Sequence, residues 1–258
     1  MIRFPARFCA ITVAAAALAT APLSAQEADT SAANDPTAPI TSYQFQNYYT
    51  PNFHNDPAAS ANRLQFRAAV PFTLGNLNHI FRVTVPYQTE TATGDSGFGD
   101  ITIFDLVTFE REWGRFGVGA VALLPTGSSG LSTEKWGIGP AAGFVAQADW
   151  GIWGLFNQNV FTVAGDDAKP DVDISIVQPI LNLQLGNGWS VGTSEMTATY
   201  DWNTKEWVSL PLGVGINKIV PTGGNPWQLS LTYERNFADT FVQPRDTIAF
   251  TAKLLVTN

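Results

Sequence analysis

Residues able to carry out chemistry are few and widely separated in this chain. There are two histidines, His54 and His79, and the single cysteine is Cys9. His54 lies in a polar segment and is followed by Ser60, whereas His79 precedes an apolar run. A serine hydrolase needs a nucleophile, a base and an orienting group within hydrogen-bonding reach of one another. The sequence therefore predicts no catalytic residue, and His54 with Ser60 is kept as the basis of a lipid-hydrolase alternative.

The sequence also predicts no metal and no cofactor. The acidic stretch 165–173 could offer carboxylates to Ca²⁺, but Lys169 and Pro170 interrupt it and the EF-hand spacing is absent. We interpret it as a solvated loop. The glycine-rich stretch 94–100 leads into an extended pattern and not a helix, so it lacks the anion-binding geometry of a phosphate loop.

The composition indicates a folded chain whose surface does not all face water. Charged residues make up 14% of the 258 positions, against about 25% in an ordinary soluble domain. Hydrophobic residues reach 45% and aromatic residues 12%, which excludes disorder for the bulk of the chain. The net charge of -8, without any cluster of Lys or Arg, disfavours a nucleic-acid partner.

Residues 1–25 have the pattern of a secretory signal peptide. Arg3 and Arg7 precede the apolar run 8–21, which is too short for a comfortable membrane helix. We expect cleavage after Ala25, which removes Cys9 and leaves no thiol. Residues 26–39 are rich in Ala, Asp, Thr and Pro, and we expect a disordered tail there. Residues 40–258 form the remaining, single domain.

The dominant pattern in that domain is alternation with a period of two. At 206–217, for example, Val208, Leu210 and Leu212 alternate with smaller or polar residues, which is typical of a half-buried strand. Parity is lost at 101–105 and 176–178, where we expect bulges. Twelve strands are predicted, near 41–50, 62–74, 79–89, 98–110, 115–125, 135–148, 152–164, 172–185, 189–200, 206–219, 227–237 and 246–257.

The gaps between these strands alternate in length. Those at 75–78, 111–114, 149–151 and 186–188 are short, and those at 51–61, 90–97, 126–134 and 165–171 are longer and polar. Bacterial outer-membrane barrels have short periplasmic turns and longer external loops. The sequence therefore predicts an all-β fold, a single closed up-and-down antiparallel transmembrane barrel of about twelve strands. A periplasmic β-sandwich or ligand-binding barrel is the soluble alternative.

Tryptophan placement favours the membrane alternative. The eight residues flank the strand ends and would form two interfacial girdles. The first group adjoins the short turns and the second the long loops: Trp113, Trp150, Trp153, Trp189 and Trp227, then Trp136, Trp202 and Trp207. Between the girdles, Leu210, Leu212 and Val214 are predicted to face lipid.

Several charged residues fall at positions predicted to face the lumen. They are Arg63, Arg67, Arg82, Glu90, Asp105, Glu234 and Lys253. A turn centred within 75–78 would place Arg63 opposite Glu90 and Arg67 opposite Pro86, and Arg82 could meet Asp105. Such residues could orient a passing solute, or they could pair only to close the barrel. We favour the structural role, because buried charges need partners in any barrel.

An ordered set of short segments resembles a known family. They are 94–102 with Phe104-Asp105, Leu124–Gly127, Lys135–Pro140, Gln158-Asn159, Ala164–Asp166, Gln178-Pro179, Gly188-Trp189 and Leu210–Gly215. In this order they are similar to the meta-pathway phenol-degradation proteins, also called outer-membrane transporters, over roughly residues 62–237. The resemblance implies a Gram-negative outer-membrane barrel associated with uptake of phenolic or other small hydrophobic compounds.

These observations predict a passive, porin-like channel for small aromatic or hydrophobic solutes, and not an enzyme. Its expected surroundings are outer-membrane lipid and the barrel-assembly machinery, and the particular solute is unknown. Two alternatives stay open: a structural barrel with a closed lumen, and the lipid hydrolase described above.

Overall fold

The computed structural model describes residues 30–193 and 195–256; the predicted signal peptide lies outside the described residues. The described part contains one short helix and fifteen strands. They are α1 (Thr30–Asn34), β1 (Thr41–His54), β2 (Ala61–Leu74), β3 (Leu77–Glu90), β4 (Gly97–Phe98), β5 (Ile101–Arg111), β6 (Gly114–Leu124), β7 (Lys135–Ala148), β8 (Gly151–Gly165), β9 (Ile174–Gly186), β10 (Trp189–Gly192), β11 (Ala198–Asp201), β12 (Glu206–Ser209), β13 (Pro211–Val220), β14 (Trp227–Asn236) and β15 (Gln243–Val256). In these ranges, no helix is long and apolar enough to span a membrane.

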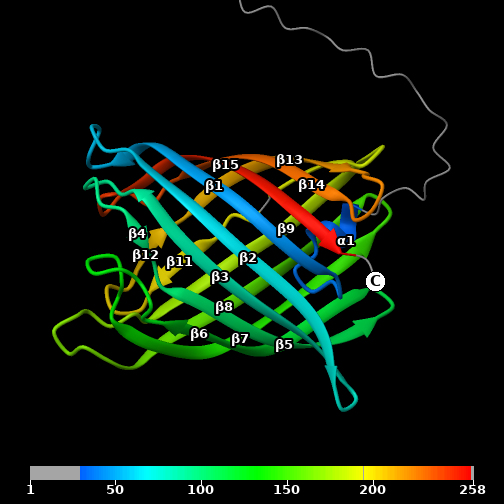
Figure 1. The fold of residues 1–258 in the computed structure, drawn as a ribbon, viewed down its shortest axis with the longest axis horizontal. Coiled ribbons are helices and arrows are strands. Elements are labelled where there is room, and N and C mark those ends of the chain that lie inside the picture. The colour runs from blue at the N-terminus through cyan, green and yellow to red at the C-terminus, as the bar shows by residue number, and fades with distance from the viewer. Residues whose placement is uncertain (1–29, 194, 257–258) are drawn as a thin grey trace, which may run out of the picture.

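The strands close into one antiparallel barrel (Figure 1). The last strand, β15, pairs with the first, β1. β10 pairs with both β9 and β13, so hydrogen bonding between neighbouring strands continues around the whole barrel. β4 and β5, β10 and β11, and β12 and β13 each form one interrupted strand, which gives the twelve strands of the barrel wall. The prediction of a closed twelve-stranded antiparallel barrel is therefore confirmed.

Short turns and long loops lie at opposite ends, as Figure 1 shows. The short-turn end also carries α1 and the last described residues of β15, and the long-loop end carries β4, β11 and β12. Two of the short turns contain residues suited to two-residue hairpins. Gly75 has a φ of 63° at the first turn position, and Asn187 and Gly188 have φ values of 52° and 73°. Turns with a positive φ at the first central position match the right-handed twist of tightly connected strands.

The bulges occur at positions other than those predicted. β5 pairs with β6 without a register shift through 101–111, and β8 pairs with β9 without one through 174–183. Shifts occur instead near strand ends, for example between Trp136 and Gly137 and between Asn62 and Arg63. The loss of parity at 101–105 has another cause: one barrel wall is apolar on both of its faces.

The outer surface carries a broad apolar belt. Leu210, Leu212 and Val214 are exposed, as are Leu231 and Phe250 on neighbouring strands. Seven of the eight tryptophans are exposed and Trp227 is half-buried. A closed barrel satisfies its backbone hydrogen bonds within the wall, so this belt can face lipid hydrocarbon.

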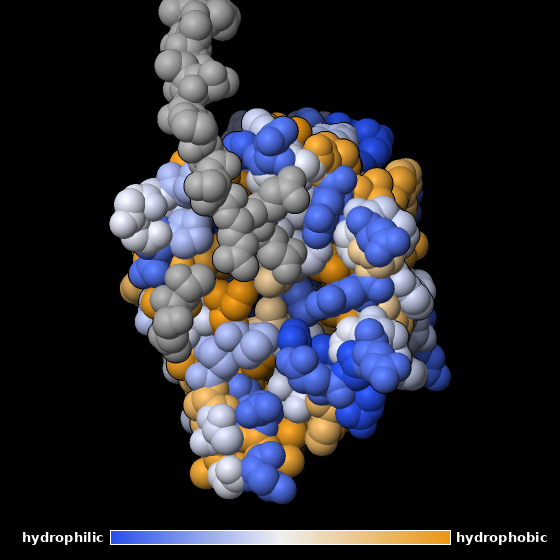
Figure 2. Space-filling model, turned by 90° about the vertical axis from the view of Figure 1, so that its right-hand side faces the viewer, coloured by the Kyte–Doolittle hydropathy of each residue, from blue (hydrophilic) through white to orange (hydrophobic). Residues whose placement is uncertain are grey.

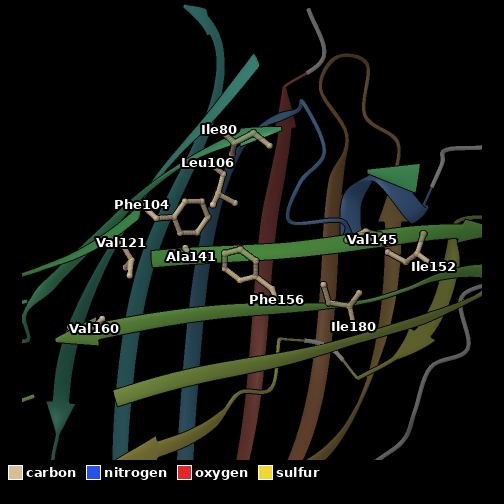
Figure 3. Packing of buried hydrophobic residues seen from close by; sticks show 10 residues of the cluster. All are labelled: Ile80, Phe104, Leu106, Val121, Ala141, Val145, Ile152, Phe156, Val160 and Ile180. Carbon is tan, nitrogen blue, oxygen red and sulfur yellow. The ribbon is translucent and has the colours of Figure 1, made fainter. Parts of the chain in front are cut away.

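The inner surface has one polar half and one apolar half. β13, β14, β15, β1 and β2 turn polar side chains inward, including Asn217, Gln228 and Gln44. From β3 to β9 the inward positions form a hydrophobic cluster (Figure 3). Within it, the ring centres of Phe104 and Phe156 lie 5.6 Å apart, and the two ring planes are tilted relative to each other. The members are Ile80, Phe104, Leu106, Val121, Ala141, Val145, Ile152, Phe156, Val160 and Ile180.

Glycines on the apolar wall make room for these rings. A Cβ atom at Gly143 would lie 2.4 Å from the Phe156 ring. Small residues beneath large ones let the lumen of a narrow barrel be filled by side chains. Part of the lumen is thus a packed core, and the open space lies on the polar side.

One wall strand is interrupted between β10 and β11. Thr193 still donates a backbone hydrogen bond to Leu181, but residues 195–197 belong to no strand. The flanking strands carry prolines there, Pro179 in β9 and Pro211 in β13. Proline has no N–H to donate, so it weakens strand pairing at this position. Glu195 leaves the wall at this interruption.

Residues 30–40 cross the lumen at the short-turn end. We expected a disordered tail over 26–39, but α1 and residues 35–39 are largely buried among the strands. Ala33 packs against Ile219 and Leu255, and polar side chains of the segment find partners on several strands. Figure 2 looks onto this end and shows hydrophilic groups mixed with hydrophobic ones, without a continuous apolar surface.

Candidate functional site

An elongated cavity opens from the long-loop end into the lumen. Its volume is about 630 Å³. The polar half of the wall contributes Tyr48 and Glu234, and β2 and β3 contribute three arginines. Those arginines are Arg63, Arg67 and Arg82. Arg63 and Arg67 lie on β2, and Arg82 on β3 is in register with Ala69, two residues beyond Arg67. Since residues on a strand rise about 3.3 Å each, the three arginines follow one another from the loops toward the centre of the barrel.

The cavity floor is a cluster of charges around Glu195. Glu195 forms an ion pair with Arg67, accepts a hydrogen bond from Gln46 at 2.9 Å, and lies 3.8 Å from the Lys253 amine. Arg67 also donates to Thr84 at 3.4 Å. These contacts tie β1, β2, β3 and β15 to the interrupted strand. We call Arg67, Arg82, Glu195 and Lys253 the constriction.

Arg82 completes the constriction without an acid of its own. Its guanidinium carbon lies 3.8 Å from the centre of the Phe104 ring and 6.0 Å from that of Phe156. Such stacking stabilises the cation through the ring quadrupole but uses none of its N–H donors. Among the described residues, none forms a hydrogen bond or an ion pair with the Arg82 guanidinium. It lines the outer cavity and also a smaller one below it.

The smaller cavity, of about 70 Å³, lies between the constriction and residues 30–40. Below it, Asp35 forms an ion pair with Arg115 at 3.0 Å. Lys253 donates to the Ala33 carbonyl at 2.9 Å, and Gln228 donates to Asn34 at 3.0 Å. Segment 30–40, which we call the plug, is thus fixed to strands on both sides of the lumen and closes the short-turn end.

A second set of contacts fixes the rim of the outer cavity. The Asp100 carboxylate accepts hydrogen bonds from the Thr133 hydroxyl at 2.6 Å and from the Gly127 N–H at 2.9 Å. Burial by itself would raise the pKa of Asp100, but these bonds, together with one from Ser132, hold that pKa below its ordinary value. The loop at 125–134 is therefore held against the start of β5.

Five of the seven charged residues predicted for the lumen face it in the structure. They are Arg63, Arg67, Arg82, Glu234 and Lys253. Arg63 stacks on Tyr48 at 4.5 Å, and Glu234 is paired in register with Gly213. Their inward direction follows from the period of two, and the structure adds which of them meet.

The predicted pairs involving Glu90 and Asp105 are wrong. Arg63 is in register with Gln88 and Arg67 with Thr84, while Glu90 is exposed at the end of β3. The turn consists of residues 75–76, so its centre lies closer to β2 than we predicted.

Asp105 points away from the lumen. Its neighbours Phe104 and Leu106 occupy the inward positions of β5. On the outside, the Asp105 carboxylate oxygen Oδ2 accepts a hydrogen bond from Nδ1 of the His79 ring at 2.9 Å. Asp105 therefore cannot form an ion pair with Arg82 in the lumen. The cause is the regular register of β5, which directs Phe104 inward and Asp105 outward.

Sequence reasoning missed Glu195 and the plug. We predicted one continuous strand over 189–200, so Glu195 had no assigned role. Pro179 and Pro211 on the two flanking strands were the available signal, because both remove backbone donors beside that strand. The polar composition of residues 30–37 gave no sign that the lumen would supply their partners.

The histidines form no nucleophilic site among the described residues. His54 Nε2 lies 2.8 Å from the backbone carbonyl oxygen of Asn236, and no contact joins it to Ser60. His79 stacks on Phe72 and contacts Asp105, without a hydroxyl partner. The described residues also contain no group of three or more side chains suited to hold a metal.

Comparison with known proteins gives likeness of fold only. No protein-family model matches the chain, and no curated protein sequence matches it. The COG4313 outer membrane channel from Pseudomonas putida F1 has a similar structure, with a TM-score of 0.64 and 15% identity over 84% of this chain and 94% of that chain. Outer membrane phospholipase A from Escherichia coli gives a TM-score of 0.44 and 12% identity over 91% and 99%.

Proposed function

We propose that the chain is an outer-membrane channel for passive passage of small aromatic or hydrophobic solutes. The observation that carries this proposal is the cavity of about 630 Å³ inside a closed barrel, open at the long-loop end. It is closed at the other end by the plug, which is not part of the wall. A path through the lumen therefore needs displacement of one short segment and no break in the barrel.

The composition of the lumen supports the solute class. The cavity is lined by polar and charged side chains together with apolar ones, among them Phe53, Pro86 and Ile176. A small molecule with an apolar body and a polar group fits such a mixed lining. The resemblance to the phenol-degradation proteins and the likeness of fold to a P. putida channel agree with this proposal.

The barrel with a closed lumen is the second candidate, and the plug contacts favour it. Asp35, Asn34 and Ala33 are all bonded to wall residues, which would suit a purely structural barrel. A hydrolase is less well supported, because His54 is bound to a backbone carbonyl and not to a nucleophile.

Uptake measured in cells tests the channel directly. A strain lacking this chain is expected to take up a trace amount of radiolabelled phenol or toluene several-fold more slowly than its parent. The unmodified chain should restore the rate, and Thr102→Trp should not, because Thr102 lines the cavity and a bulky ring there would block it.

Ile103→Trp is the matched control, since the next residue of β5 lies on the opposite face. It should restore uptake fully. If Thr102→Trp restores uptake as well as Ile103→Trp does, the lumen is not the route. If deletion of the chain leaves uptake unchanged, the structural barrel is the better account.

A further inference from the structure

The constriction is basic in an otherwise acidic protein. Arg67, Arg82 and Lys253 surround a single carboxylate, Glu195, whereas the chain as a whole has a net charge of -8. Low-dielectric walls focus the field of such a cluster and raise the local concentration of ions of opposite charge. A solute in the lumen therefore meets net positive charge where the outer and the smaller cavity adjoin.

Arg82 has the donors for an acidic ligand. The Phe104 ring covers one flat face of its guanidinium at 3.8 Å, and none of the guanidinium N–H groups is bound to a described residue. A guanidinium presents its donors as a planar fork that matches a carboxylate with two parallel bonds. Since Arg82 lines both cavities, that fork is reachable from the lumen.

Glu195 shows which chemical group the cluster accepts. Its carboxylate is bound by Arg67 and Gln46, and Glu195 belongs to residues 195–197, which lie outside the strands. The cluster thus already binds one carboxylate, and the Arg82 guanidinium is available to bind a second. A phosphate dianion would match the same positive charge, so phosphate is one of the probes in the experiment.

The cavity above Arg82 offers space for a flat apolar body. Phe104 covers one face of the guanidinium from behind, and Pro86 and Ile176 line the cavity. We infer that the constriction binds a small aromatic monocarboxylate, with the carboxylate on Arg82 and the ring toward Pro86 and Ile176. This inference refines the proposed function by naming an anionic aromatic substrate class, and it rests on that function only for the solute's passage.

Calorimetric titration of the full chain in detergent tests the inference, with benzoate, benzamide and inorganic phosphate as probes. Benzamide keeps the ring and the shape but carries no charge. The unmodified chain should bind benzoate at least tenfold more tightly than either of the other two. Arg82→Met should weaken benzoate binding at least tenfold, and Arg82→Lys should restore part of it.

Lys218→Met is the charge control, because the Lys218 amine lies 4.9 Å from the Trp189 ring on the outer surface. It should change benzoate binding less than twofold. Equal binding of benzoate and benzamide would overturn the inference, as would unchanged benzoate binding in Arg82→Met. Phosphate binding as tight as benzoate binding would reduce the site to a simple anion site and overturn the aromatic part.

Two further measurements keep these outcomes distinct. Heat-modifiable migration on a detergent gel shows whether Arg82→Met forms a closed barrel; if it does not, the benzoate and benzamide comparison on the unmodified chain decides. If benzoate binds but Thr102→Trp has no effect on uptake, the proposed channel is contradicted and the carboxylate site stands. If Thr102→Trp blocks uptake but benzoate is not bound preferentially, the carboxylate site is contradicted and the proposed channel stands.

Discussion

Leu231→Arg is expected to lower the free energy of unfolding by about 2–4 kcal/mol, as for an arginine near the bilayer midplane. Leu231 is 54% exposed and is paired in register with Ile216 and Phe250, which are also exposed. A charge there has only lipid around it. Denaturant unfolding of the barrel in lipid vesicles would give the difference directly.

Two alanine variants serve as controls for that experiment. Leu231→Ala should cost much less than Leu231→Arg, because the side chain packs against lipid and not against the protein core. Leu106→Ala should cost about 2–5 kcal/mol, since Leu106 is 0% exposed in the lumenal cluster. If Leu231→Ala proved as costly as Leu106→Ala, the two faces of the barrel would be assigned wrongly.

Glu195→Ala is expected to destabilise the barrel by about 2–3 kcal/mol. It leaves Arg67 and Lys253 without their carboxylate, and removing one partner of a fully buried pair costs roughly 3–5 kcal/mol. The Glu195 side chain is 29% exposed, so water in the lumen offsets part of that cost. The same unfolding measurement in vesicles applies.

Lys169→Ala provides the comparison at the surface. Lys169 pairs with Glu134 at 3.0 Å, and the two side chains are 38% and 39% exposed. Exposed pairs contribute about 0–1 kcal/mol, so this variant should be nearly neutral. Equal effects of Glu195→Ala and Lys169→Ala would show that Glu195 does not hold the constriction together.

Much of the barrel could be predicted from the sequence because period-two patterns fix the face of each side chain. The inward directions of Arg67 and Lys253 and the outward direction of Val214 follow from that period alone. The strand ends beside the short turns lie within two residues of their predicted positions, since a glycine or Asn-Gly pair meets a geometric need of tight turns. At the long-loop end the prediction was poorer, because β1 continues to His54, within the predicted loop 51–61.

Pairing across strands was harder to predict. Moving the turn centre at residues 75–76 replaced Glu90 by Gln88 opposite Arg63, and no local pattern decides between these. Asp105 was misplaced for a related reason: β5 is apolar on both faces, so alternation could not show which face was inward. The plug and Glu195 depend on partners distant in sequence, which local periodicity does not report.

The plug offers the most direct test of a lumenal channel. Planar-bilayer recording should compare the unmodified chain with a variant lacking residues 30–39, which removes the bonds to Arg115, Gln228 and Lys253. We expect small, infrequent conductance steps from the unmodified chain and steps several-fold larger, and persistent, from the variant. Electrical silence of a correctly folded variant would contradict passage through the lumen and leave a closed structural barrel.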